Sequence, residues 1–140
     1  MDNIYIEFKE KQQNEINKFP IQWAFSEGQL KEAMIKLNVN NREELATIGA
    51  GSVLKKDDVN KWFELMNKQN IDKNNLIKEN DTFVYEMFKY ELNNYEYAYT
   101  QDLTEIFENI GLDYKKVMNN ERLTNILNKA KEEYLNKIDY

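Results

Sequence analysis

Cysteine and histidine are both absent from this 140-residue chain, and their absence excludes several kinds of chemistry. Without cysteine there is no disulfide, no thiolate metal ligand and no cysteine nucleophile. Without histidine there is no imidazole base, no Ser-His-Asp arrangement and no zinc site of a common type. Any reaction would have to depend on carboxylates, lysines, tyrosines or a hard cation.

Arginine and long apolar runs are also scarce. Arginine occurs only at Arg42 and Arg122, so the side chain best suited to bidentate contacts with phosphates and bases is almost missing. The codon usage of an AT-rich genome is the simpler explanation of that scarcity, and we favour it. The net charge of −6 opposes binding to nucleic acid and to anionic membranes. No apolar run approaches the ~20 residues that span a bilayer, and the first residues do not resemble a signal peptide. We expect a cytoplasmic protein with no direct nucleic-acid or membrane partner.

Hydrophobic residues make up 41% of the chain and aromatic residues 13%, which predicts a folded protein. The length favours a single domain over residues 1–140. Apolar residues at helical spacing predict a mainly α fold of about six helices. These helices cover approximately residues 3–18, 26–37, 58–71, 81–95, 102–110 and 120–138, with a short extra helix over 113–118.

A small antiparallel hairpin or short sheet is predicted between the early helices. Residues 20–25 alternate in polarity as a strand does, and residues 46–49 and 52–55 flank a glycine-containing turn. Gly49 and Gly51 supply the positive φ angles that a tight turn requires. This turn, which includes Ser52, is also a candidate anion-binding site, although its spacing matches neither of the common phosphate-binding loops.

The acidic charge is concentrated in residues 79–108, which contain eight carboxylates and one base, a local charge of −7. Tyrosines are frequent in the same segment. Because they cannot all face inward, we expect part of the segment to form an acidic, tyrosine-rich surface suited to a protein interface. The candidate binding residues there are Tyr95, Glu96, Tyr97, Tyr99, Asp102 and Glu105.

Glu91 is the most informative single residue. At 100° per residue it lies in the middle of the apolar stripe formed by Val84, Met87 and Phe88. A carboxylate there must be hydrogen-bonded or paired, because its burial otherwise costs several kcal/mol. One possible source of donors is the Gly49–Ser52 turn. Glu91 then either fixes a loop against a helix or serves as a perturbed acid in a pocket.

The carboxylates Glu86, Glu91 and Glu96 do not form a row on one helix face. They are five residues apart, so each one is rotated by 140° around the helix axis from the one before. A metal site built from these three is therefore not expected. No cofactor is predicted either. A carboxylate-dependent hydrolase stays an alternative, provided that two of the acids meet within ~5–9 Å in one cleft.

Several segments resemble an uncharacterised family of small proteins from phages and mobile elements of clostridia and related Firmicutes. The resemblance covers approximately residues 20–125. Its most specific part is the pattern YxMFxYELxNxEY, matched by Tyr85, Met87, Phe88, Tyr90, Glu91, Leu92, Asn94, Glu96 and Tyr97. The weaker parts are WAFSEGQ at 23–29, the IGAG segment followed by Lys56 and Asp58, and a helix end at Gly111 and Leu112. Relatives often have histidine at the position of Tyr95. The resemblance implies an accessory gene and transfers no activity.

Two function hypotheses follow. In the first, the chain binds a host protein stoichiometrically through its acidic, tyrosine-rich surface, and defence nucleases are a suitable target class. In the second, the chain is a small-ligand or nucleotide-binding module that uses Glu91 and the Gly49–Ser52 turn. We favour the first. The sequence favours a non-catalytic role over an enzymatic one, with the hydrolase as the open alternative.

Overall fold

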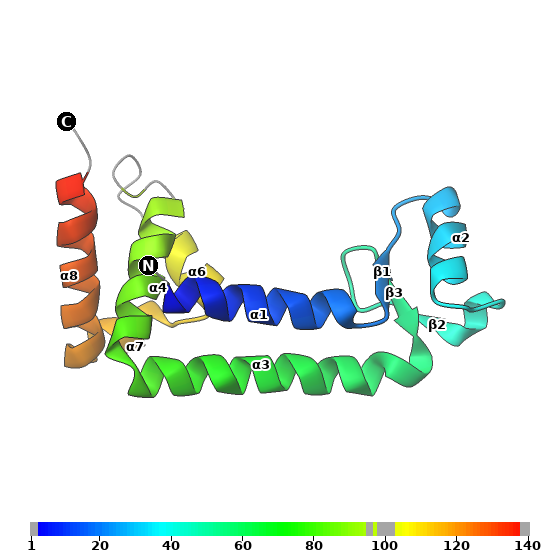
Figure 1. The fold of residues 1–140 in the computed structure, drawn as a ribbon, viewed down its shortest axis with the longest axis horizontal. Coiled ribbons are helices and arrows are strands. Elements are labelled where there is room, and N and C mark those ends of the chain that lie inside the picture. The colour runs from blue at the N-terminus through cyan, green and yellow to red at the C-terminus, as the bar shows by residue number, and fades with distance from the viewer. Residues whose placement is uncertain (1–2, 95–96, 98–102, 138–140) are drawn as a thin grey trace. The chain divides into compact units, whose positions relative to one another are not determined.

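The computed structural model describes residues 3–94, 97 and 103–137. Within them the chain has seven α-helices and a three-stranded antiparallel sheet (Figure 1), which confirms the mainly α fold with a short sheet. None of the helices in these ranges is long and apolar enough to cross a bilayer. The helices are α1 (Ile4–Lys18), α2 (Glu27–Lys36), α3 (Val59–Glu79), α4 (Asp81–Asn94), α6 (Thr104–Ile110), α7 (Tyr114–Met118) and α8 (Glu121–Lys137). The strands are β1 (Ile21–Trp23), β2 (Leu45–Ala46) and β3 (Ser52–Lys55).

The contacts divide the chain into two compact units. Unit 1 consists of Met1–Lys9 and Lys73–Tyr140, and unit 2 of Glu10–Asp72. The expectation of a single domain over residues 1–140 stays a prediction.

The core of unit 1 is built around α4. Five of its apolar side chains are fully buried, which is typical of a helix covered on several sides. These are Phe83, Val84, Met87, Phe88 and Leu92, and they pack with the buried residues of α6, α7 and α8. Since burying a large apolar side chain contributes about 1.5–3 kcal/mol, α4 carries much of the stability of this unit.

Capping hydrogen bonds close the helix ends of unit 1. Gly111 ends α6 with φ 72°, and the backbone N–H of Leu112 donates to the carbonyl of Phe107 at 3.0 Å. Asp113 caps α7 by accepting from the backbone N–H of Lys115 at 2.8 Å. These caps fix the directions in which the helices leave each turn.

Unit 2 contains the sheet, in which β3 is the central strand. β1 pairs with β3 in antiparallel register through Ile21 and Leu54, and β2 pairs with its other edge through Ala46 and Leu54. Leu54 is fully buried. Helix α2 begins after Ser26, whose hydroxyl caps it by accepting from the backbone N–H of Gln29 at 3.2 Å.

Helix α3 is longer than the sequence pattern predicts. The predicted helix ends near residue 71, before Asn74 and Asn75, yet the observed helix continues to Glu79. The reason is that an asparagine costs a helix less than about 0.7 kcal/mol, whereas Ile77 farther on is buried in the core of unit 1. The break comes at Asn80, whose side chain caps α4 by accepting from the backbone N–H of Phe83.

Candidate functional site around Glu91

Glu91 lies in the interior of unit 1, as its position in the apolar stripe of α4 predicts. Its side chain is 0% exposed and sits among the fully buried Met87, Phe88 and Leu92. Among the described residues, Glu91 is the only acidic residue that is buried. Such a group is stable as an anion only if donors replace the water that it has lost.

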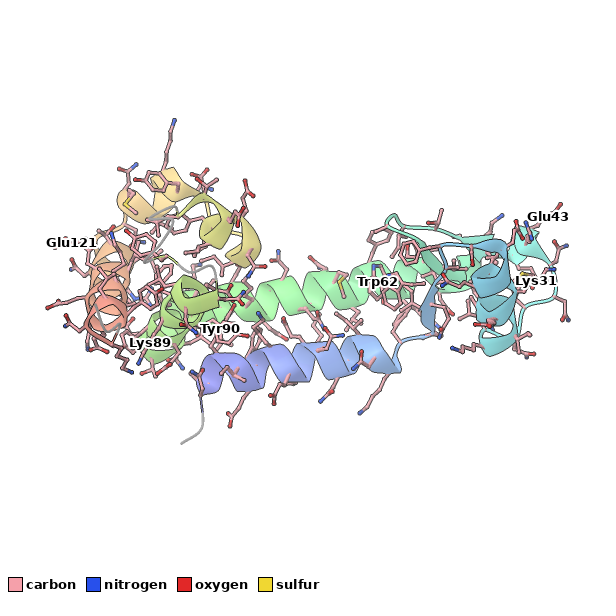
Figure 2. All side chains as sticks on the ribbon, turned by 90° about the horizontal axis from the view of Figure 1, so that it is seen from above. Lys31, Glu43, Trp62, Lys89, Tyr90 and Glu121 are labelled. Carbon is pink, nitrogen blue, oxygen red and sulfur yellow. The ribbon has the colours of Figure 1, made fainter. Side chains whose placement is uncertain are left out.

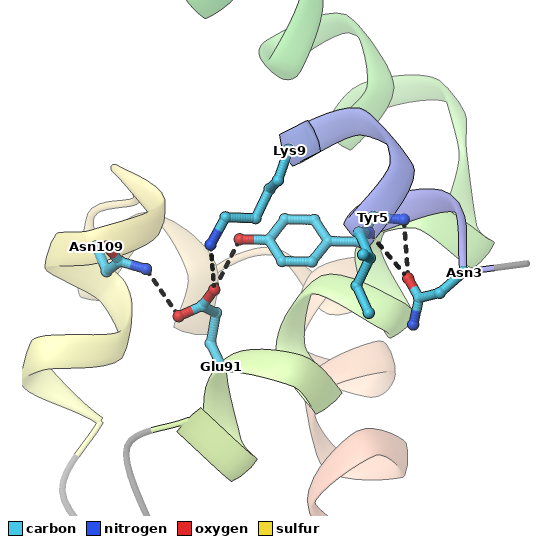
Figure 3. A network of polar contacts seen from close by, with 6 residues as sticks. Asn3, Tyr5, Lys9, Glu91 and Asn109 are labelled. Carbon is cyan, nitrogen blue, oxygen red and sulfur yellow. Dashed lines mark hydrogen bonds and ion pairs between the residues drawn. The ribbon is translucent and has the colours of Figure 1, made fainter. Parts of the chain in front are cut away.

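Three side chains supply those donors (Figure 3). The hydroxyl of Tyr5 donates to Oε1 at 2.8 Å, and Nζ of Lys9 lies 3.4 Å from the same oxygen. On the other oxygen, Nδ2 of Asn109 donates to Oε2 at 2.7 Å. Tyr5 and Lys9 belong to α1 and Asn109 to α6, so the carboxylate of α4 is tied to both of these helices.

Aromatic rings complete the surroundings of the Lys9 ammonium. Its Nζ lies 4.9 Å from the ring centre of Tyr90 and 5.4 Å from that of Tyr5. Both distances suit a cation–π contact. The side chain of Lys9 remains 43% exposed, so its attraction to Glu91 is partly screened by water.

Lys73 at the start of the unit 1 part of α3 adds a second positive group. Burial lowers the pKa of Lys73, while attraction to Glu91 raises it and repulsion by Lys9 lowers it further. The net effect is a pKa below the ordinary value for lysine. Two lysines, Lys9 and Lys73, therefore lie near the one internal carboxylate.

This arrangement suits a structural role better than a chemical one. Each oxygen of Glu91 already accepts a hydrogen bond from a side chain of the same unit. The cleft of unit 1 that is lined by Tyr90 and Asn93 does not include Glu91 in its wall. We conclude that the network fixes α1 and α6 against α4.

The Gly49–Ser52 turn does not provide the donors for Glu91, contrary to one of the sequence-based alternatives. The turn lies in unit 2, and its groups have local partners. The Ser52 hydroxyl accepts from the backbone N–H of Ile48 at 2.9 Å, and Ser52 is buried. Gly49 and Gly51 do have positive φ angles, 106° and 74°, as the tight turn requires. The turn is closed by its own hydrogen bonds.

The remaining candidate residues are only partly within the described structure. Tyr95, Glu96, Tyr99 and Asp102 lie outside the described residues. Tyr97 is half-buried and packs its ring against Tyr134 at 6.4 Å, so it contributes to packing. Glu105 is exposed on α6.

Sequence reasoning missed a surface cleft in unit 1. The cleft has a volume of about 400 Å³ and is lined by residues of α4 and α8, together with Asn3. Lys89 and Tyr90 of α4, two of its lining residues, are labelled in Figure 2. No sequence motif marks it, because its two walls are separated by more than forty positions along the chain.

A metal centre finds no support in the described part of the chain. No group of three or more aspartates and glutamates there is placed to hold an ion. Glu86 faces the cleft, where its Oε2 accepts from Nδ2 of Asn3 at 2.8 Å, whereas Glu91 is internal. For the hydrolase alternative, Glu96 or Asp102 would have to meet one of these acids or each other, and both lie outside the described residues.

Comparison with known proteins identifies the family and no function. No curated protein and no solved structure matches the chain. A family of unknown function (DUF7659) matches over residues 4–133, which is almost the entire sequence. The chain therefore belongs to this family of unknown function.

Proposed function

We propose that this chain is an accessory protein of a phage or mobile element that binds a host protein stoichiometrically. In this proposal, binding takes place in the cytoplasm through the acidic, tyrosine-rich surface of residues 79–108. The mobile-element origin rests on the resemblance carried by the segments at 23–29 and 85–97. The binding mode rests on the placement of the acidic side chains.

The observation that carries the proposal is the outward surplus of negative charge on α6. Glu105 and Glu108 are both exposed, while Ile106 and Phe107 between them are buried. Residues three positions apart on a helix are neighbours on its surface. Among the ion pairs of the described residues, none includes Glu105 or Glu108.

Other acids of the segment have partners inside the protein. Asp81 accepts from Nε of Arg122 at 2.5 Å, Glu86 accepts from Asn3, and Glu91 is enclosed by its three donors. Glu79, at the other end of the segment, is also exposed and in none of these ion pairs, but Glu105 and Glu108 are the two exposed, unpaired acids that lie together on one helix. Burying an unpaired carboxylate against another acidic or apolar protein would be costly, so the partner surface should be basic.

A basic groove that normally holds nucleic acid has the required complementarity. An acidic protein can occupy such a groove and exclude the nucleic acid. Host defence nucleases are a class with this kind of groove, and an anti-defence inhibitor is the most specific form of the proposal.

The test is capture of partners from host lysate by the immobilised full chain, at salt concentrations rising from about 0.05 to 0.5 M. We expect a partner that elutes as salt rises and that is lost when Glu105 and Glu108 are both changed to lysine. The matched control is the pair Glu64→Lys and Glu132→Lys, two exposed helix positions with the same change of charge. Partners retained equally by both variants, or retained at high salt, would rule out binding led by charge.

A further inference from the structure

We propose that the cleft between α4 and α8 in unit 1 binds a phosphate group, free or as a small monoester, between Lys89 and Lys137. The cleft lies on α4 and α8, whereas the exposed acids that carry the docking proposal, Glu105 and Glu108, lie on α6. Its volume of about 400 Å³ falls within the range of roughly 300–1,000 Å³ typical of small-molecule sites.

The two lysines approach each other from different helices. Lys89 extends from α4, and Lys137 is the last residue of α8; both line the same cleft. Contact with the Lys89 amine is the main cause of a lowered pKa of Lys137. Two ammonium groups that line one cleft repel each other, and an anion placed between them would remove that repulsion.

Neighbouring carboxylates do not neutralise this pair directly. Glu86 and Glu133 both lie close enough to raise the pKa of Lys137, but that effect is smaller than the effect of Lys89. None of the ion pairs between described residues joins either carboxylate to Lys89 or Lys137. The negative end of the α8 dipole gives a structural reason for a lysine at position 137, but it does not explain the approach of Lys89.

The rest of the lining suits a polar ligand. Asn93 supplies an amide at the end of α4, and Tyr90 is 36% exposed. The carboxylate of Glu86, held by Asn3, can accept from a ligand hydroxyl. Lysines bind phosphate as point charges, so two of them with an amide match a phosphate dianion, and Glu86 favours a phosphate that carries hydroxyl groups.

The test is calorimetric titration of the full chain at pH 7 with inorganic phosphate, glycerol 3-phosphate and glycerol, in chloride buffer of matched ionic strength. We expect saturable one-site binding of both phosphates and none of glycerol. Tighter binding of glycerol 3-phosphate would assign the ester as the natural class, and equal or tighter binding of inorganic phosphate would assign the free ion. In the wild-type chain, the NMR signal of the Lys137 side chain should shift in proportion to the bound fraction.

Substitutions locate the site. Lys89→Gln and Lys137→Gln should each raise the dissociation constant about tenfold or more, and Lys129→Gln should leave it within about twofold. Lys129 is the matched control because it is an exposed lysine of α8 that does not line this cleft. Absence of saturable phosphate binding by the wild type would overturn the proposal. Unchanged binding by the Lys89 and Lys137 variants, or equal weakening by Lys129→Gln, would do the same.

Discussion

The hydroxyl of Tyr5 donates a hydrogen bond to the buried carboxylate of Glu91 at 2.8 Å, across 86 positions of the chain. Tyr5 is itself buried, and its ring packs edge-to-face against Phe83 at 5.5 Å. The bond therefore lies in a largely dry environment, where a hydrogen bond is stronger than in water and its loss is more costly. This hydrogen bond holds the first turns of α1 against α4, the central helix of unit 1.

A double-mutant cycle between Tyr5 and Glu91 measures this link. Tyr5→Phe should lower the free energy of unfolding by about 1.5–3 kcal/mol, because a charged acceptor loses its donor. Glu91→Gln should also destabilise, since the Lys9 ammonium loses its partner. The coupling energy should be about 0.5–3 kcal/mol in urea denaturation followed by circular dichroism. Tyr114→Phe at an exposed tyrosine of the same unit is the control. If the two substitutions changed the free energy of unfolding additively, the stabilising hydrogen bond between Tyr5 and Glu91 would be contradicted.

Lys73 gives a prediction for pH. Burial places the folded-state pKa of Lys73 below its value in the unfolded chain, near 10.5. The unfolded chain therefore binds more protons between the two values, so this group adds stability as pH rises through that window and subtracts it below. The stability of Lys73→Met relative to the wild type should consequently decline from pH 7 towards pH 10.5.

That difference is measured by urea denaturation of both chains at several pH values, which cancels the titration of the other groups. Lys116→Met, at an exposed lysine, controls for the same substitution on the surface. A relative stability of Lys73→Met that rises with pH would show the opposite sign and contradict the burial argument.

Two glycines predict opposite responses to alanine. Gly51 has φ 74°, and a Cβ there would come within 2.4 Å of the Phe25 ring, so Gly51→Ala should destabilise by about 1–2 kcal/mol even if the ring moves aside. Gly28 lies in α2 with no atom within 4 Å of an added Cβ. Gly28→Ala should therefore stabilise by up to about 1 kcal/mol. Thermal unfolding of the two variants provides the comparison, and a stable Gly51→Ala would show that the turn can change its backbone conformation.

Local features were predictable from the sequence because neighbouring residues determine them. Ser26 and Gly111 mark helix ends through hydrogen bonds within a few positions, and the burial of Glu91 follows from the spacing of its own helix. The donors to Glu91 were not predictable, because Tyr5 and Asn109 reach it only after the chain has folded. The cleft was not predictable for the same reason, because no sequence pattern connects Lys89 with Lys137.

The length of α3 was underestimated because a local sequence signal was given too much weight. Asparagines at 74 and 75 are typical of a loop, but packing of Ile77 in the core of unit 1 outweighs their weak preference. The acidic surface could be predicted only in part. The exposure of Glu105 and Glu108 follows from the apolar pattern of α6. The hydrogen bonds from Arg122 to Asp81 and from Asn3 to Glu86 join residues far apart in the sequence, so no sequence pattern predicts them.

The most direct test of the proposed function is the dissociation constant for the captured host partner, measured by calorimetry with purified proteins. The account predicts one-to-one binding that weakens with salt, and a loss of about tenfold or more in affinity when Glu105 and Glu108 are changed to lysine. The Glu64→Lys and Glu132→Lys control should stay within about twofold of the wild type. An affinity unchanged by the α6 substitutions, or reduced equally by the control, would contradict it.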